Sequence, residues 1–321
     1  MSINVQKWLI SGYTGPGKPD MLMVAYDTQT GAINTLASAC LGDNPSYLLC
    51  ADGRYYVSFE VHDSSVAARI ARLEMGNRGV SAAKRMCIPG AYGLCHMSFH
   101  GGFIYGSCWA SGHVFCVDAQ LEAVRWIVKN DDGSGLMPHA HWTAMRPDGL
   151  LLCADAGLDA LLVYRPQDGA FVRAAPMVKG AAPRQMLLRA NGLPMIVINE
   201  GAPSFHTVDE RTLEIGATFS LPKGNNPGGA CLTPQGLLLI PNRGPNSISL
   251  FDAKAEAPHL LGETACGGDF PRCVCASTDG KTVLSLNQRG NNVRFFSLAS
   301  DRLEGKADVR AFGASCAVQI Q

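Results

Sequence analysis

The chain repeats one strand–turn–strand frame six times. In each copy an apolar segment leads to a turn that ends in glycine, and a second apolar segment follows and closes on a polar residue. Clear copies read PSYLLCADGRYYVSFE at 45–60, PHAHWTAMRPDGLLLCAD at 138–155 and PRQMLLRANGLPMIVINE at 183–200. The turn glycines follow one another at steps of 49, 47, 43, 44 and 44 residues: Gly53, Gly102, Gly149, Gly192, Gly236 and Gly280. A period of this length with several short strands per unit predicts a β-propeller.

Each frame continues into further strand-like segments. Third strands are expected at DALLVYRP (159–166) and NSISLFDA (246–253), and fourth strands, less distinct, at LEIGATFSL (213–221) and HLLGETA (259–265). These segments alternate apolar residues with small or polar ones, which suits strands. Residues 63–77 permit a helix, but they also fit the third strand of their repeat, and we favour the strand.

The two ends of the chain together supply one more unit. KWLISGYTG (7–15) and DMLMVAYDT (20–28) resemble a second and a third strand without a first, and GASCAVQI (313–320) resembles a first strand alone. Pairing these ends removes the unpaired edges that an open arrangement would leave. We therefore expect an all-β fold, a seven-bladed β-propeller whose closing blade is shared by the N- and C-terminal strands, as one domain over residues 1–321.

Composition narrows the classes of partner. Lys plus Arg and Asp plus Glu both total 27, so no broad field attracts nucleic acid or an anionic membrane. No apolar run reaches the roughly 18 residues that a membrane span needs. The first residues, MSINVQKWLISGYT, do not resemble a secretory signal. We expect a cytoplasmic protein, a monomer or weak homo-oligomer, that acts on a small molecule.

The chain has 12 cysteines, and without a secretion signal they are expected to be reduced thiols. Most lie in apolar strand segments, which suggests core positions: Cys50, Cys95, Cys116, Cys153, Cys231, Cys273 and Cys275. Cys273 and Cys275 form a C-x-C pair, whereas the C-x-x-C spacing of structural zinc sites does not occur.

Alignment of the copies on the turn glycine brings polar residues to matching positions. The first two strands of a blade form an antiparallel hairpin, so the start of the first and the end of the second lie at the same end of the blade. Eight residues before the glycine stand His141, Arg184 and Arg272. Six to eight residues after it stand Glu60, Trp109, Asp155, Glu200, Arg243 and Gln288. His139, two residues before His141, is expected to face the same way along the strand.

Such a set of side chains suits an anionic ligand that undergoes proton transfer. Arginine binds carboxylate or phosphate in a bidentate manner, and His and Glu move protons near neutral pH when their pKa values are tuned. Two simpler explanations remain open: strand ends are often polar, and His139 with His141 could hold a metal together with Glu200 or Asp155. Two histidines are too few ligands by themselves, so we expect no metal and no cofactor.

The same segments resemble the seven-bladed lactonase family, which includes propeller-type 6-phosphogluconolactonases and fungal carboxy-muconate lactonising enzymes. The resemblance rests on P-H-x-H at 138–141, on P-R followed sixteen residues later by N-E (Arg184 to Glu200), and on N-R-G at 242–244. It implies that His141, Arg184, Glu200 and Arg243 are active-site residues, with His139 beside them, and that no metal is used. Gln185 departs from the family, which often has histidine there, and so does the Gly101-Gly102 turn.

We therefore expect hydrolysis of a sugar-type lactone, with 6-phosphogluconolactone as the first candidate. Arg184 and Arg243 would anchor the anionic group, while His141 and Glu200 would share the roles of general base and general acid. The expected substrate contacts around them are His139, Arg272, Glu60, Asp155 and Gln288. Two alternatives stay open: a muconate-type lactone cycloisomerase that uses the same residues, and a propeller scaffold that binds a ligand without turnover.

Overall fold

The computed structural model describes residues 4–14, 17–76 and 79–320. Within these ranges the regular structure is entirely β, with 28 strands arranged in four-stranded sheets. The sheets number seven, one for each expected blade, and neighbouring strands in the registers below run antiparallel. No helix among the described residues has the length and hydropathy needed to cross a membrane.

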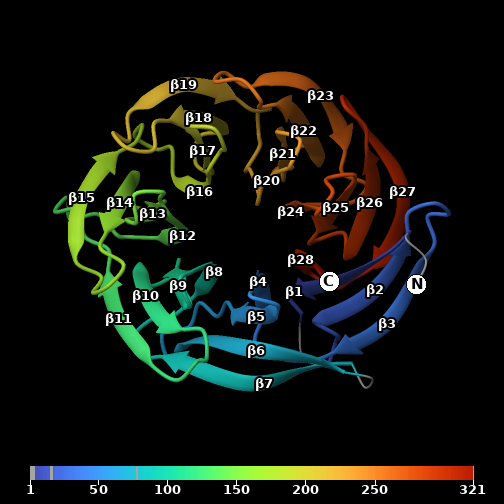
Figure 1. Ribbon diagram of the computed structural model, residues 1–321, viewed down its shortest axis with the longest axis horizontal. Coiled ribbons are helices and arrows are strands. Elements are labelled where there is room, and N and C mark those ends of the chain that lie inside the picture. The colour runs from blue at the N-terminus through green and yellow to red at the C-terminus, as the bar shows by residue number, and fades with distance from the viewer. Residues whose placement is uncertain (1–3, 15–16, 77–78, 321) are drawn as a thin grey trace. The chain divides into compact units, whose positions relative to one another are not determined.

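The two ends of the chain share one sheet, in the order β28-β1-β2-β3 (Figure 1). Its strands are β28 (Ala314–Ile320), β1 (Val5–Gly12), β2 (Met21–Asp27) and β3 (Ile33–Ala39). β28 pairs antiparallel with β1 from Lys7 opposite Ile320 to Gly12 opposite Ala314. The prediction of a blade shared by both termini is confirmed, with the C-terminal strand in the place of the missing first strand.

The other six sheets each come from one continuous stretch of chain. Three of them precede residue 180: β4 (Pro45–Ala51), β5 (Arg54–Phe59), β6 (Ala68–Gly76) and β7 (Gly79–Ile88); β8 (Leu94–His100), β9 (Phe103–Cys108), β10 (His113–Asp118) and β11 (Val124–Lys129); β12 (Ala140–Met145), β13 (Leu151–Asp155), β14 (Ala160–Tyr164) and β15 (Phe171–Pro176). The strand β6 confirms the strand interpretation of residues 63–77 over the described part of that segment.

Three more sheets follow toward the C-terminus: β16 (Pro183–Leu187), β17 (Met195–Asn199), β18 (Ser204–Val208) and β19 (Ile215–Ser220); β20 (Cys231–Leu232), β21 (Leu237–Asn242), β22 (Ser247–Asp252) and β23 (His259–Ala265); β24 (Pro271–Ala276), β25 (Thr282–Asn287), β26 (Asn292–Leu298) and β27 (Leu303–Arg310). The third and fourth strands expected from the repeats are all present. β20 is shorter than the others, because the stretch before it contains the Gly228-Gly229 pair and joins its sheet only by a bridge between Pro227 and Asn242.

Burial follows the position of a strand in its sheet. Second strands such as β13, β17 and β25 are buried at every residue. β13 and β17 are apolar up to a final Asp155 or Asn199, whereas β25 also buries Thr282 and Ser285. The fourth strand β19 alternates between half-buried and exposed residues, as expected for a strand with one covered face. The repeated apolar segments of the sequence thus correspond to second strands that are covered on both faces of their sheets.

By its internal contacts the chain divides into two compact units. The first unit comprises Met1–Tyr55, Leu73–Ala82 and Leu221–Gln321, and the second comprises Tyr56–Arg72 and Ala83–Ser220. Each unit has its own apolar clusters, and each is described below by itself.

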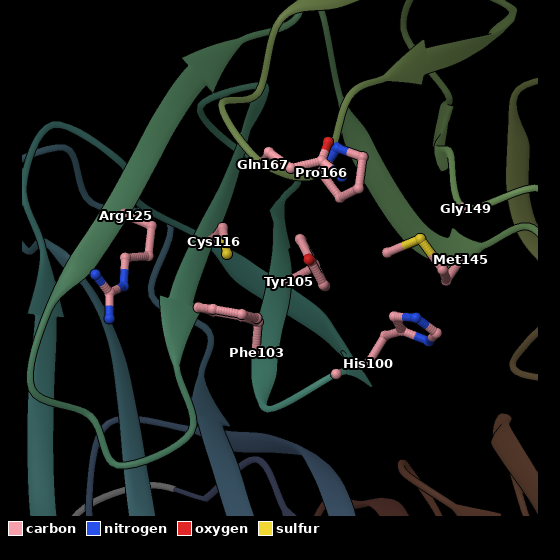
Figure 2. Close-up of a pocket in the computed structure, with 10 residues that line it drawn as sticks. His100, Phe103, Tyr105, Cys116, Arg125, Met145, Gly149, Pro166 and Gln167 are labelled. Atoms are coloured by element: carbon pink, nitrogen blue, oxygen red, sulfur yellow. The ribbon is translucent and has the colours of Figure 1, made fainter.

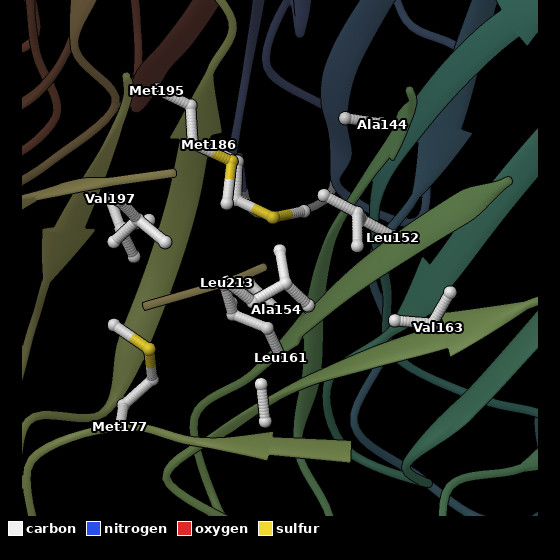
Figure 3. Close-up of a cluster of buried hydrophobic side chains, with 12 residues drawn as sticks. Ala144, Leu152, Ala154, Leu161, Val163, Met177, Met186, Met195, Val197 and Leu213 are labelled. Atoms are coloured by element: carbon white, nitrogen blue, oxygen red, sulfur yellow. The ribbon is translucent and has the colours of Figure 1, made fainter. Parts of the chain in front are cut away.

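In the second unit one cluster joins the β12–β15 sheet to the β16–β19 sheet (Figure 3). Leu152 and Leu161 of the earlier sheet pack there with Met186 and Val197 of the later one. In the first unit a cluster containing Trp8, Phe295 and Ala317 joins the sheet of the chain ends to the β24–β27 sheet. Burial of such faces supplies the main driving force that holds successive blades together.

All twelve cysteines are free thiols, as expected. Cys95, Cys116 and Cys153 are buried, whereas Cys231, Cys273 and Cys275 are partly exposed. The expected core position of Cys50 is wrong: its side chain is exposed, close to the turn at Asp52-Gly53 that ends β4.

Candidate active site

The first strands of several blades carry a β-bulge near their start. The register of β12 with β13 shifts between Ala140 and Trp142, and that of β16 with β17 shifts between Pro183 and Gln185. The residues left without a partner are His141 and Arg184. A bulge takes a side chain out of the regular alternation of its strand and re-aims it. Local sequence favours it at Arg184, because the preceding proline cannot donate to the ladder and suits the first position of a strand.

A β-bulge at the same place occurs in two further blades. The register of β24 with β25 shifts between Pro271 and Cys273, which leaves Arg272 as the extra residue. The register of β8 with β9 shifts between Leu94 and His96, which leaves Cys95 as the extra residue. Alignment on the turn glycine singled out His141, Arg184 and Arg272 without any knowledge of the register. Cys95 escaped that alignment because it lies seven residues, not eight, before its glycine.

In the second unit His141, Arg184 and Glu200 form one cluster. Arg184 Nη1 lies 2.7 Å from His141 Nε2 and 2.5 Å from Glu200 Oε2, and His141 Nε2 lies 3.7 Å from the same carboxylate oxygen. An arginine is always a donor, so His141 Nε2 accepts this hydrogen bond with its lone pair. The imidazole is therefore uncharged, and the guanidinium lies between it and the carboxylate.

The protonation state of His141 has a physical cause. Burial is the largest contribution and the Arg184 charge the next, and together they lower the pKa of His141 to about 3 against the opposing effect of Glu200 and Glu60. The side chain of Glu200 keeps 24% of its surface exposed, whereas those of His141 and Arg184 keep 9% each. At neutral pH the cluster holds one fixed positive charge, a neutral imidazole and a carboxylate that solvent can reach.

A second carboxylate stands beside a column of stacked rings. Glu60 is buried, and its Oε1 lies 3.0 Å from Nε2 of His62. The His62 ring stacks on Trp109 at 5.3 Å between centroids, and Trp109 stacks on His139 at 4.3 Å. His139 Nδ1 also lies 2.9 Å from the Trp109 carbonyl oxygen. His62 was not among the predicted site residues, although its spacing of two from Glu60 was a usable signal.

Asp155 is fully buried and contacts the backbone of His139. Its Oδ1 accepts hydrogen bonds from the backbone N–H groups of His139, Gly157 and Leu158, and its Oδ2 accepts one from Asn130 Nδ2. Burial raises the pKa of Asp155, while these donors act in the opposite direction. The carboxylate thus ties the residues that precede β12 to the loop that follows β13, and so fixes the position of His139.

The remaining predicted site residues belong to the first unit. Arg243 is buried and donates from Nε and Nη2 to the carbonyl oxygens of Asn226, at 2.5 Å, and Pro227, at 2.9 Å. Arg272 Nη2 lies 2.5 Å from the Tyr13 hydroxyl, and its guanidinium stands 4.6 Å from the centre of that ring. Gln288 follows β25, and its backbone N–H donates to the carbonyl of Phe270. The expected convergence of Arg243, Arg272 and Gln288 with the His141 cluster stays a prediction.

Among the described residues no metal site competes for this role. Over residues 4–14, 17–76 and 79–320, no group of three or more His, Cys, Asp or Glu side chains is arranged to hold a metal ion. His139 packs on Trp109, while His141 contacts Arg184.

A cavity of about 550 Å³ opens near the hairpin turns of the β8–β11 and β12–β15 sheets (Figure 2). Phe103, Tyr105, Met145 and Pro166 line it, and Arg125 is the one carrier of a permanent charge among its ten lining residues. It lies toward the end of β12 away from His141 and contains no acid–base pair.

The chain also matches a known protein family over most of its length. A family model described as "Lactonase, 7-bladed beta-propeller" matches residues 7–314. The chain belongs to this family. The predicted family and the predicted fold class, an all-β seven-bladed propeller, are confirmed. Membership supports lactone hydrolysis as the general class of reaction.

Individual relatives are distant. An uncharacterized protein of Lactococcus lactis, YwcC, is 22% identical over 316 residues, which cover 91% of this chain and 92% of that protein. The periplasmic gluconolactonase PpgL of Pseudomonas aeruginosa has a TM-score of 0.85 at 21% identity, with 99% of each chain covered. A Bacteroides fragilis protein proposed to be a 6-phosphogluconolactonase has a TM-score of 0.86 at 19% identity, covering 100% of this chain and 99% of that one. At these identities the structural likeness establishes the fold.

Proposed function

We propose that the chain hydrolyses a lactone of a sugar acid, and that the substrate is a small anion such as 6-phosphogluconolactone. The observation that carries the proposal is the cluster of His141, Arg184 and Glu200, which combines a fixed positive charge with two groups able to accept a proton. Membership in the lactonase family supports the same class of substrate, as do the gluconolactonase and the 6-phosphogluconolactonase-like protein among its structural neighbours.

The arrangement suggests a division of labour. Because the pKa of His141 is about 3, its imidazole is not protonated at neutral pH and cannot begin the reaction as an acid. It acts instead as the base that takes a proton from the attacking water at Nε2. Arg184 turns from Nε2 to the lactone carbonyl and stabilises the oxyanion that forms as the C–O bond to water is made.

The second half of the reaction returns the proton. Burial and the Arg184 charge lower the pKa of His141, and once the oxyanion lies against Arg184 the second of these two causes is compensated. The protonated imidazole then gives its proton to the ring oxygen as the ring C–O bond breaks. Glu200 holds the guanidinium in place throughout through its contact with Nη1. One imidazole thus serves first as base and then as acid, and atoms and charge balance without an outside group.

The other residues complete the proposal. Arg243 is the second anion-binding group, and Asp155 acts through His139, whose backbone it holds. We propose the remaining predicted residues as substrate contacts: His139, Arg272, Glu60 and Gln288. Free thiols at all twelve cysteines agree with the reducing cytoplasm as the compartment.

The test is kcat/KM on a panel of sugar-type and muconate-type lactones, followed by proton release and corrected for spontaneous ring opening. Loss of a general acid–base group costs roughly 10²- to 10⁴-fold in rate, so kcat/KM of His141→Ala should fall in this way. Glu200→Gln should also lower kcat/KM, because the neutral amide no longer holds the Arg184 guanidinium through an ion pair. His206→Asn is the matched control, because His206 is a buried histidine of the same unit that bonds Thr218 on β19. Unchanged activity in both site variants would remove the assignment.

Product analysis separates the alternatives. A linear acid as product supports hydrolysis, and a lactone formed from a muconate supports the cycloisomerase. Binding of sugar acids without turnover of any lactone supports the scaffold.

A further inference from the structure

Four thiols gather within the first unit, from the first strands of three sheets. Cys231 lies on β20, Cys273 and Cys275 on β24, and Cys316 on β28. The C-x-C spacing puts Cys273 and Cys275 on the same face of their strand. Their sulfur atoms lie 3.7 Å apart, in contact with each other. The proposed lactonase chemistry uses none of these thiols.

Cys275 is the thiol that its surroundings activate. Hydrogen bonds with Cys273 and Cys316 lower the pKa of Cys275 well below that of an ordinary thiol, whereas the same pairings raise the pKa of the other two. Cys273 and Cys275 are both partly exposed, while Cys316 is buried. A thiolate that solvent reaches is the form that attacks an oxidant.

Glycine at position 229 makes room for the Cys273 sulfur beside Cys275. Gly229 bridges to Cys273, and a Cβ atom placed on Gly229 would lie only 3.0 Å from Cys273 Sγ. A larger residue at this position would push the sulfur out of its present place. Closing the gap to the roughly 2.05 Å of a disulfide then requires a local adjustment of β24.

We propose that Cys273 and Cys275 are a site of reversible oxidation, at which hydrogen peroxide converts the pair to an intrastrand disulfide. The Cys275 thiolate attacks one peroxide oxygen, the O–O bond breaks, and hydroxide leaves, so that Cys275 becomes a sulfenic acid. Cys273 then attacks this sulfur and loses its proton, and the S–O bond breaks to release water. Two thiols are oxidised by two electrons, and the peroxide is reduced to two waters after hydroxide takes up a proton.

The disulfide would act on two arginines of the proposed function, and this part rests on that function. Arg272 immediately precedes Cys273 and is the bulged residue of β24. Gly229 N–H donates to the Arg272 carbonyl at 2.8 Å, and Val274 N–H donates to the Gly229 carbonyl at 2.9 Å. Two residues earlier, the Pro227 carbonyl accepts from Arg243. A distortion of β24 between residues 273 and 275 therefore reaches Arg272 through the adjoining backbone, and it reaches the Arg243 guanidinium through the segment from Gly229 to Pro227.

The oxidation is tested by mass spectrometry on the full chain. Trypsin cuts after Arg272 and Lys281, so one peptide, CVCASTDGK, holds both cysteines and no others. After limited peroxide treatment this peptide should lose two hydrogen masses and regain them with dithiothreitol. Cys273→Ser should trap the sulfenic acid on Cys275, where dimedone labels it, and Cys275→Ser should abolish the reaction at this site. Cys87→Ser is the control, because Cys87 is exposed and outside the cluster.

Two outcomes overturn the site: a disulfide between Cys275 and Cys316 instead, or an unmodified peptide when the exposed Cys40, Cys50 and Cys87 are already oxidised. For the coupling, we expect oxidation to lower kcat/KM at least tenfold in wild type and in Cys87→Ser, but not in Cys273→Ser or Cys275→Ser. A disulfide that leaves the rate unchanged overturns the coupling alone. A wild type inactive on every lactone overturns the proposed function, while the mass of the peptide still reports on the disulfide.

Discussion

Replacing Arg184 by glutamine should raise the pKa of His141. The guanidinium Nη1 lies 2.7 Å from His141 Nε2, which puts the centre of its charge somewhat farther away. Two unit charges at ~4 Å with an effective dielectric constant of ~20 interact by ~4 kcal/mol, or ~3 pKa units. Burial, the largest cause of the lowered pKa, remains in the variant and keeps the pKa of His141 below its ordinary value. We therefore expect the pKa to rise by about 2 units from the wild-type value of about 3.

The titration is followed by NMR on the ring signals of His141 as the pH is lowered from neutral. The His141→Gln spectrum assigns the signals among the eight histidines. Arg146→Gln is the matched control: Arg146 is a buried arginine of the same unit, and its Nη2 lies 2.5 Å from Asp148. That variant removes an equal charge but should leave the pKa of His141 where it was.

The same variant tests the proposed mechanism. A more basic imidazole would accept a proton more readily, but the oxyanion would lose its guanidinium, so kcat/KM should still fall. A His141 that titrates near the ordinary histidine range in wild type would refute the reasoning. An identical titration in wild type and Arg184→Gln would refute it as well, because the Arg184 charge would then have no influence on the ring.

Three further predictions concern stability and positioning. Burial lowers the pKa values of His96 and His141, so the unfolded chain binds protons near pH 6.5 that the native chain does not. The free energy of unfolding should be highest above that pH and should fall below it, by ~2 kcal/mol at pH ~5 for each such group. Urea unfolding at neutral pH and at pH ~5 should show a smaller decrease in His96→Phe than in wild type. An equal decrease in both proteins would contradict this. Gly157→Ala places a Cβ against the Met137 carbonyl and 2.8 Å from His139 Cδ2. Gly157→Ala should lower the free energy of unfolding by ~1–3 kcal/mol, measured by thermal unfolding, and should also lower kcat/KM. Gly262→Ala should change neither quantity, because a Cβ there meets open space. Leu161→Ala should destabilise by ~2–5 kcal/mol in denaturant unfolding, against less than ~0.5 kcal/mol for the exposed Val172→Ala, and similar losses would refute the packing account.

Much of the fold was predictable because the repeat is a local property of the chain. A strand covered on both faces is largely apolar, and a hairpin turn needs a residue that tolerates positive φ. Gly149, at φ 83°, and Gly192, at φ 71°, are such residues. Alignment on the turn glycines counted six units, and the strand-like segments left at 7–15 and 313–320 supplied the seventh, as the pairing of β28 with β1 confirms.

The candidate site was predictable only in part. Hairpin topology alone brings the start of a first strand and the end of a second together, and this put His141, Arg184 and Glu200 on one list. It did not reveal His62, whose importance comes from Glu60 and the Trp109 ring. Nor did it distinguish Asp155, which is fully occupied by protein donors, from side chains that solvent can reach.

By itself, then, the sequence determined the number of blades, the closing pair of strands and the positions at which polar groups recur. Each of these follows from spacing along the chain. Only the tertiary structure decided that a bulge turns His141 toward Arg184, that burial and the guanidinium together keep this imidazole neutral, and that Cys275 meets Cys273 and Cys316. Register, burial and contact between distant strands depend on how whole sheets pack, and a local pattern does not contain them.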